Sequence, residues 1–226
     1  MKVGAIIPAA GSGKRIGTST PKQFLEIQGK PLLQHTLDVF TSCRLIDYVV
    51  LVMPCADVDA MGKDWLNNYE IIRDVVVGGD RRQDSVYNGF NSLAKTTDIV
   101  VVHDGVRPFT TPQMITTTVE EAQQHGAAIT AIPVSDTIKQ AADGFVKQTV
   151  SRDELWRVQT PQAFQYGLLQ RAFKKAKEDS YYGTDEGSLV EYLGERVKVV
   201  PGSELNIKIT RKEDLVLGES LLSRIK

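Results

Sequence analysis

The sequence contains few residues of the kinds that build metal centres and disulfides. Its 226 residues include two cysteines and three histidines, and Cys43 and Cys55 have no spacing typical of a zinc or redox site. The formal net charge of -1 gives no indication of a nucleic-acid surface. No apolar stretch approaches the length of a membrane span. We therefore expect a cytoplasmic globular protein that binds neither nucleic acid nor a membrane.

The first part of the chain alternates short apolar runs with helical patterns. Five runs rich in Val and Ile predict buried strands, and four segments between them predict helices. Buried strands that alternate with helices are typical of a doubly wound, mostly parallel sheet, so we predict an α/β, Rossmann-like fold. The predicted strands are residues 3–8, 48–53, 71–77, 99–103 and 127–133, and the predicted helices are residues 31–42, 57–68, 82–94 and 112–125.

The pattern changes between residues 134 and 152. Asp143-Gly144 is a strong hairpin signal, and its polar flanks have little to bury. Because an isolated hairpin is marginally stable in water, we expect residues 134–152 to form a projecting β-arm that packs on a second subunit of a homodimer. A two-residue loop pairs Thr137 with Val150 and places Arg152 diagonally beside Thr137 on one face.

Helical and strand patterns return after the arm and complete one domain, which we expect to span residues 1–226. Thr184 is a predicted N-cap, because the acidic residues Asp185 and Glu186 favour the positive end of a helix. Residues 204–209 alternate polar and apolar side chains and predict a strand. The other predicted elements are helices at residues 164–178, 184–193 and 211–225, and a strand at 196–200.

A glycine-rich loop follows the first predicted strand, at the edge where such sheets bind ligands. Its small residues let backbone N–H groups approach phosphate oxygens, and Arg15 and Lys22 can neutralise phosphate charge. The spacing differs from a P-loop because Arg15 follows Gly13-Lys14, and from a dinucleotide fingerprint because Gly17 comes one residue late. A tight turn with solvated basic residues is the alternative. The loop consists of Pro8, Ala9, Ala10, Gly11, Ser12, Gly13, Lys14 and Arg15.

Three later segments carry polar residues near the ends of predicted strands. Gly79-Asp80 and Ser85 can supply hydrogen-bond donors and acceptors to a base, or Asp80 can cap the next helix. Asp104-Gly105-Val106-Arg107 follows an apolar strand and indicates a binding site, with a plain surface ion pair as the alternative. By periodicity alone, Lys208 is the solvent-facing residue of its predicted strand.

Six motifs together resemble the nucleotidyltransferases that join a nucleotide to a sugar or polyol phosphate. The resemblance covers nearly the whole chain, and it is closest to the 2-C-methyl-D-erythritol 4-phosphate cytidylyltransferase family. It implies a CTP-dependent cytidylyltransferase of the non-mevalonate isoprenoid pathway. The motifs are residues 9–15 with Pro21-Lys22-Gln23, and residues 78–86, 102–109, 133–139, 159–164 and 206–210.

The resemblance also implies roles for individual residues. Arg15 and Lys22 stabilise charge on the triphosphate, and Arg152 and Lys208 position the attacking phosphate, with Thr137 and Arg152 reaching across a dimer. Magnesium is expected mainly on the CTP phosphates, so no protein ligand is named. The implied nucleotide-binding residues are Pro8, Ala9, Ala10, Gly11, Ser12, Gly13, Arg15, Lys22, Gly79, Asp80, Ser85 and Asp104. The implied residues for the polyol phosphate are Asp104, Gly105, Arg107, Thr137, Arg152, Thr160 and Lys208.

The implied reaction needs no general base. A phosphate monoester with a second pKa near ~6 is largely ionised at neutral pH and can attack the α-phosphorus in line. His103 is accordingly expected to be structural. Two alternatives stay open, namely a ribitol 5-phosphate cytidylyltransferase on the same scaffold and a non-catalytic nucleotide-binding module. The two basic pairs disfavour the second alternative, because binding alone does not need them.

Overall fold

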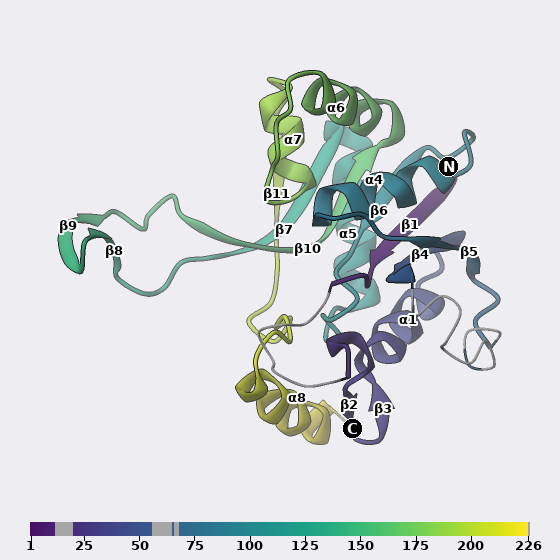
Figure 1. Cartoon of the computed structure of the whole chain (residues 1–226), viewed down its shortest axis with the longest axis horizontal. Coiled ribbons are helices and arrows are strands. Elements are labelled where there is room, and N and C mark those ends of the chain that lie inside the picture. The colour runs from purple at the N-terminus through teal and green to yellow at the C-terminus, as the bar shows by residue number, and fades with distance from the viewer. Residues whose placement is uncertain (12–19, 56–64, 66–67, 226) are drawn as a thin grey trace.

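The fold is built on a seven-stranded sheet with the strand order β11-β7-β10-β6-β1-β4-β5 (Figure 1). The structure is a computed structural model and describes residues 1–11, 20–55, 65 and 68–225. Neighbouring strands run parallel except at β10, which is antiparallel to both β6 and β7. The strands are β1 (Val3–Pro8), β4 (Tyr48–Met53), β5 (Ile72–Val77), β6 (Ile99–Val102), β7 (Ala127–Pro133), β10 (Trp156–Gln165) and β11 (Lys198–Pro201).

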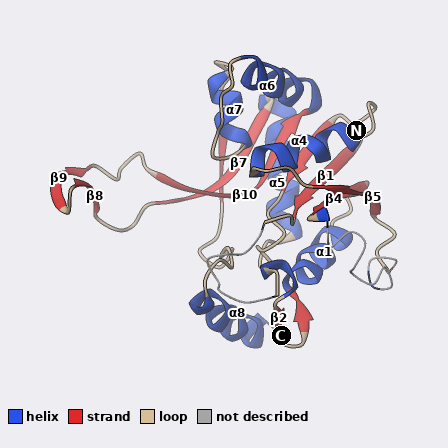
Figure 2. Ribbon diagram, viewed as in Figure 1, coloured by secondary structure: helices blue, strands red, loops and turns tan. Residues whose placement is uncertain are grey.

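Helices cover both faces of this sheet (Figure 2). Consecutive residues of β1 point to opposite faces: Ile7 joins a buried cluster with Phe40 of α1, and Ile6 joins a second cluster with Phe90 of α4. The predicted doubly wound, mostly parallel α/β fold is therefore confirmed. The helices are α1 (Leu32–Ser42), α4 (Arg82–Ser92), α5 (Pro112–His125), α6 (Tyr166–Glu178), α7 (Glu186–Tyr192) and α8 (Lys212–Ile225). Among the described residues, no helix has the length and apolar character needed to cross a membrane.

A third, smaller core lies under α8. Ile27 of β2 (Glu26–Ile27), which pairs with β3 (Lys30–Pro31), is buried together with Phe109 and Ile209. This core joins the segment that carries Lys208 to the segment that follows Lys22, which begins the short 3-10 helix η1 (Lys22–Phe24). Two basic residues that are far apart in the sequence are thus anchored on the same small core.

The structure contains one strand that was not predicted and lacks one that was predicted. The sequence patterns miss β10, because Pro161 argues against a central strand; the ladder accommodates it through a register shift between Val158 and Gln162. The predicted strand at 204–209 is wrong, because this segment pairs with no other strand among the described residues and is held by separate hydrogen bonds. One of them runs from the Ile209 N–H to the Val106 carbonyl over 2.9 Å.

Most other predicted elements are confirmed within two residues at each end. The predicted N-cap of α7 is wrong by one residue: Asp185, not Thr184, caps the helix, and its carboxylate accepts the Ser188 N–H over 3.0 Å. The predicted helix at residues 57–68 lies outside the described residues except at positions 65 and 68.

The predicted hairpin is present and projects from the body of the molecule (Figure 1). It consists of β8 (Ile138–Ala142) and β9 (Phe145–Val150), and both turn residues have positive φ, 53° at Asp143 and 81° at Gly144, as a two-residue hairpin turn of this kind requires. The predicted register is wrong. A bulge after Gln140 pairs Ile138, rather than Thr137, with Val150.

The corrected register removes the argument that placed Thr137 and Arg152 on one face of the hairpin. Both residues lie just beyond the paired segment. The Arg152 guanidinium donates instead to the Ser135 carbonyl of its own arm. A single bulge is enough to cause this error, because side chains alternate with a period of two along a strand.

Candidate active site

A cavity of about 370 Å³ lies at the carboxyl ends of β1, β5 and β6. Two loops meet there because Gly78 lacks a side chain: a Cβ at Gly78 would lie 2.3 Å from the Cβ of Ala10. This contact brings the end of β5 against the end of β1. The cavity is lined by Pro8, Ala9, Ala10, Gly11, Lys22, Gln23, Gly79, Asp80, Arg81, Arg82, Ser85, Asp104, Val106 and Lys208.

Residues 8–11 of the first loop form one wall of this cavity. Lys22 reaches the same wall, since a Cβ built on Gly11 would lie 3.5 Å from the Lys22 Nζ. A lysine ammonium therefore lies beside backbone that contains only small residues, an arrangement that suits phosphate. The predicted Ser12, Gly13 and Arg15 lie outside the described residues.

The Gly79–Ser85 turn forms another part of the cavity wall. The buried Ser85 hydroxyl accepts the Gly79 N–H over 3.1 Å and lies 3.1 Å from the Arg81 carbonyl, so it fixes the shape of this turn. Asp80 lines the cavity and does not cap α4. The cap is Arg81, whose N–H donates to the Asp84 carboxylate over 3.1 Å. The helix-capping alternative for Asp80 is therefore wrong.

The Asp104 carboxylate is surrounded by three cations, although the residue is only 7% exposed. Lys208 Nζ lies 2.9 Å from one oxygen, Arg107 Nε lies 3.4 Å from the same oxygen, and Arg82 Nε lies 3.4 Å from the other. Burial raises the pKa of Asp104, but the charges of Lys208, Arg82 and Arg107 outweigh it and hold the pKa far below its usual range. The carboxylate is therefore ionised at neutral pH.

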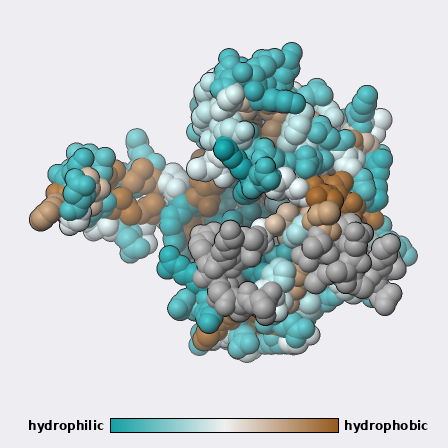
Figure 3. Space-filling view, viewed as in Figure 1, coloured by the Kyte–Doolittle hydropathy of each residue, from teal (hydrophilic) through white to brown (hydrophobic). Residues whose placement is uncertain are grey.

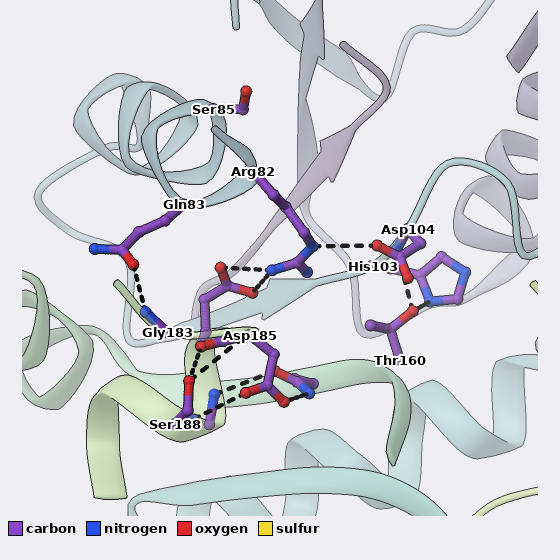
Figure 4. Close-up of polar contacts among 12 residues, drawn as sticks. Arg82, Gln83, Ser85, His103, Asp104, Thr160, Gly183, Asp185 and Ser188 are labelled. Atoms are coloured by element: carbon purple, nitrogen blue, oxygen red, sulfur yellow. Dashed lines mark hydrogen bonds and ion pairs between the residues drawn. The ribbon is translucent and has the colours of Figure 1, made fainter. Parts of the chain in front are cut away.

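A second cavity of about 210 Å³ adjoins the first. Arg82, Asp104 and Lys208 line both cavities, so this charged cluster forms their common wall. Arg107 and Thr160, which are predicted to bind the polyol phosphate, line the second cavity. Figure 4 shows the Arg82 guanidinium directed at the Asp104 carboxylate. The same guanidinium also donates to a second carboxylate, that of Glu186.

The remaining predicted residues are divided between this region and the arm. Gly105 packs beneath the loop, where a Cβ would lie 3.1 Å from Leu33. Thr137 and Arg152 line neither cavity and lie on the projecting arm. The structure therefore brings Asp104, Arg107, Thr160 and Lys208 together within one chain, but not the two arm residues.

His103 is held at both ring nitrogens in the buried interior. Nε2 lies 3.1 Å from the Arg107 carbonyl, which can only accept, so Nε2 carries the proton. Nδ1 then accepts the Thr160 hydroxyl over 3.0 Å, and the Thr160 oxygen accepts the Asp104 N–H over 3.1 Å. The ring ties Asp104, Arg107 and Thr160 to one another, and this geometry agrees with the structural role predicted for it.

Three residues of the site were missed as individual candidates. Arg82, which is partly exposed, and the buried Glu186 form an ion pair, which their positions at two helix starts do not reveal. Asn206 is fully buried, although the predicted strand made it an ordinary alternating residue. Its carbonyl accepts Arg107 Nη1 over 2.7 Å, and its side-chain amide donates to the Thr160 carbonyl over 2.8 Å. The alternation of polar and apolar residues around Asn206 predicted a strand and gave no sign that its side chain is buried.

The described residues contain no group of three or more His, Cys, Asp and Glu side chains that could hold a metal ion. Asp80 and Asp104 supply the two carboxylates that line the first cavity, and Asp104 already faces three cations. This donor set fits a metal that arrives on a triphosphate better than one held in a protein cage.

Comparison with known proteins assigns the chain to a family. The model of the 2-C-methyl-D-erythritol 4-phosphate cytidylyltransferase family matches residues 3–224. The 2-C-methyl-D-erythritol 4-phosphate cytidylyltransferase of Syntrophus aciditrophicus is 47% identical over 226 residues, which cover 99% of this chain and 97% of the relative. The chain belongs to the 2-C-methyl-D-erythritol 4-phosphate cytidylyltransferase family.

Solved structures of this cytidylyltransferase family have the same fold. The 4-diphosphocytidyl-2C-methyl-D-erythritol synthase of Anaerococcus prevotii has a TM-score of 0.87 and 35% identity, covering 99% of both chains. The Thermus thermophilus cytidylyltransferase has a TM-score of 0.82 and 32% identity, covering 99% of this chain and 100% of that one. The predicted enzyme class, a cytidylyltransferase, and the predicted CTP-dependent cytidylyl transfer in isoprenoid biosynthesis are confirmed.

The stability of this cytidylyltransferase should depend on pH through His103. Burial lowers the pKa of His103 from 6.5 to about 4, so the unfolded chain takes up this proton first as the pH falls. The stabilising effect is present above pH 6.5 and is lost as the pH falls toward 4. We expect the free energy of unfolding, measured with urea, to drop by about 2 kcal/mol between pH 7 and pH 5.

The control for this prediction is a comparison of substitutions at two histidines, His103 and His125. His103→Gln should flatten the pH dependence, whereas His125→Gln, which changes a histidine at the exposed end of α5, should preserve it. An equal pH dependence in wild type and His103→Gln would contradict the proposed protonation state of His103.

Proposed function

We propose that the two adjoining cavities divide the substrates of the family reaction between them. CTP occupies the larger cavity, 2-C-methyl-D-erythritol 4-phosphate occupies the smaller one, and transfer of the cytidylyl group releases pyrophosphate. The observation that carries this proposal is the common wall of Arg82, Asp104 and Lys208, which places cations at the junction of two anion-sized spaces. Two polyanions can be held next to each other only where their repulsion is offset.

The nucleotide half combines the first loop with the Gly79–Ser85 turn. We assign the triphosphate to the backbone of Pro8, Ala9, Ala10, Gly11, Ser12 and Gly13 and to the side chains of Arg15 and Lys22. Lys22 and Arg15 stabilise the charge that develops as pyrophosphate leaves. Gly79, Asp80 and Ser85 recognise the base, with Ser85 holding the turn that presents the backbone groups.

The acceptor half is built around Lys208. The phosphate of the polyol attacks the α-phosphorus of CTP in line, while Lys208 and Arg152 position it and Asp104, Gly105, Arg107, Thr137 and Thr160 complete its surroundings. The attacking phosphate is already ionised at neutral pH, so it needs no general base. His103 does not serve as one, because both of its ring nitrogens are engaged.

Magnesium bound by the CTP phosphates would supply charge neutralisation to the triphosphate. Asp80 and Asp104 are the carboxylates on the cavity wall that can contact it or its water. The residues of the nucleotide half and the acceptor half would still orient the two substrates.

We further propose that residues 1–226 form one cytoplasmic nucleotidyltransferase domain, which dimerises through the arm at residues 134–152. Phe145 is 78% exposed and Val146 is 62% exposed, and brown, hydrophobic atoms are visible on the arm in Figure 3. Such side chains are poorly accommodated in water and gain stability when a second subunit covers them. Thr137 and Arg152 would then reach the acceptor half of the neighbouring subunit.

The acceptor is tested by pyrophosphate release from CTP with two polyol phosphates. We expect turnover with 2-C-methyl-D-erythritol 4-phosphate to exceed that with ribitol 5-phosphate by about a hundredfold or more, because a pocket built for one polyol leaves polar groups unpaired with another. Lys22→Ala should lower turnover by orders of magnitude without unfolding the protein. Equal or greater turnover with ribitol 5-phosphate would overturn the assigned acceptor, and CTP binding with no turnover would indicate a non-catalytic module.

The dimeric arrangement is tested by mixing two inactive variants, Arg152→Ala and Lys22→Ala. If Arg152 serves the neighbouring subunit, each mixed dimer contains one site with both an intact Lys22 and an intact Arg152, so pyrophosphate release is recovered. No recovery is possible if Arg152 acts within its own subunit. Subunit exchange is verified by mass spectrometry of the mixed dimers, and inactivity of the confirmed mixed dimer contradicts the proposal.

A further inference from the structure

Arg82 lies between the two halves of the site. It is the first residue of α4, and its side chain, 29% exposed, lines both cavities. Its place in the first turn of α4 fixes the position of its backbone and Cβ. The far end is fixed by two carboxylates from different parts of the chain, Asp104 after β6 and Glu186 at the start of α7.

The contact between Arg82 and Asp104 determines how the Asp104 oxygens are shared. Arg82 Nε takes one oxygen at 3.4 Å, and the other oxygen is shared by Lys208 Nζ at 2.9 Å and Arg107 Nε at 3.4 Å. A carboxylate held at one oxygen by a planar guanidinium presents its second oxygen in a defined direction. Loss of Arg82 would free the carboxylate to rotate and would release Lys208 from its position.

Glu186 fixes Arg82 from the opposite side. It is 1% exposed, and both of its oxygens accept Arg82 Nη1, at 2.9 and 2.8 Å. Burial lowers the pKa of Arg82, but the charges of Glu186 and Asp104 outweigh it and raise the pKa, so the guanidinium stays charged. Among the described residues, the side chain of Glu186 makes no hydrogen bond or ion pair with Lys208 or Asp104, and its charge acts on Asp104 only as repulsion between two carboxylates. The direct hold of Glu186 on the cluster therefore runs through Arg82.

We propose that Arg82 is a positioning residue for cytidylyl transfer, which orients Asp104 and through it Lys208, and that Glu186 acts by holding Arg82. This inference rests on the proposed function, since Lys208 matters because it positions the acceptor phosphate. The relay runs from Glu186 to Arg82, then to Asp104 and finally to Lys208.

A simple tether between α4 and α7 is the competing explanation for the same ion pair. A tether contributes to stability, and its loss lowers the thermal unfolding midpoint without changing the kinetics of the folded enzyme. A positioning relay has a kinetic signature instead. Because the disturbed group is Lys208, the KM for the polyol phosphate rises and kcat falls, while the KM for CTP stays nearly constant.

The test is a double-mutant cycle in steady-state kinetics with CTP and 2-C-methyl-D-erythritol 4-phosphate. The variants are Arg82→Gln, Glu186→Gln and the double variant, assayed well below their unfolding midpoints. We expect each single variant to lower kcat by about tenfold or more and to raise the KM for the polyol phosphate by about threefold or more, with the KM for CTP within about twofold. The double variant should lose no more than Arg82→Gln alone, because Glu186 acts through Arg82.

The matched control is Arg171→Gln, which removes another arginine–glutamate pair, the exposed contact of 3.2 Å between Arg171 of α6 and Glu195, neither of which lines the two cavities. It should leave kcat and both KM values unchanged. If a single variant fails to fold, the double variant still tests whether the pair affects catalysis. It removes both charges of the ion pair, so neither partner is left unpaired.

Three results would overturn the proposal: single losses that multiply in the double variant, a double variant with wild-type kcat and KM values, or equal losses in Arg171→Gln. An inactive wild-type enzyme with this pair of substrates would instead refute the proposed function.

Discussion

A carboxylate buried among three cations stays ionised only while those cations remain in place, and the cations in turn stay together only because the carboxylate offsets their repulsion. Asp104 is in this position, with Lys208, Arg82 and Arg107 around it. Each cation comes from a different segment of the chain. The cluster therefore forms only when the whole sheet edge is assembled, and both cavities depend on it for their common wall.

The fold supplies the rigidity that such a cluster needs. β6 is buried at every residue and delivers Asp104 at its carboxyl end, while α4 begins with Arg82 beside it. Gly89 lets α4 lie close to the sheet, since a Cβ there would lie 2.6 Å from Ile6. His103 then locks the loop after β6 through both ring nitrogens. The charged groups are thus fixed before any substrate arrives, so little reorganisation is needed during the reaction.

The sequence was sufficient to predict the parallel core, because fully apolar runs such as 48–53 alternate with amphipathic helices. It also predicted Asp104, Arg107, Thr160 and Lys208 as one group, through the family motifs. It could not predict the Arg82–Glu186 pair, because only the tertiary fold brings α4 and α7 together. Local patterns also failed at the bulge in the arm and at residues 204–209, where side-chain alternation resembles a strand but the described part of the chain supplies no partner strand.

We propose that the charge of Asp104 organises the cations between the two substrates. This is tested by the kcat of Asp104→Asn, which keeps the size and shape of the side chain and removes its charge. With saturating CTP and 2-C-methyl-D-erythritol 4-phosphate, we expect a folded enzyme whose kcat is lower by about a hundredfold or more. A folded Asp104→Asn enzyme with a kcat close to that of wild type would contradict it.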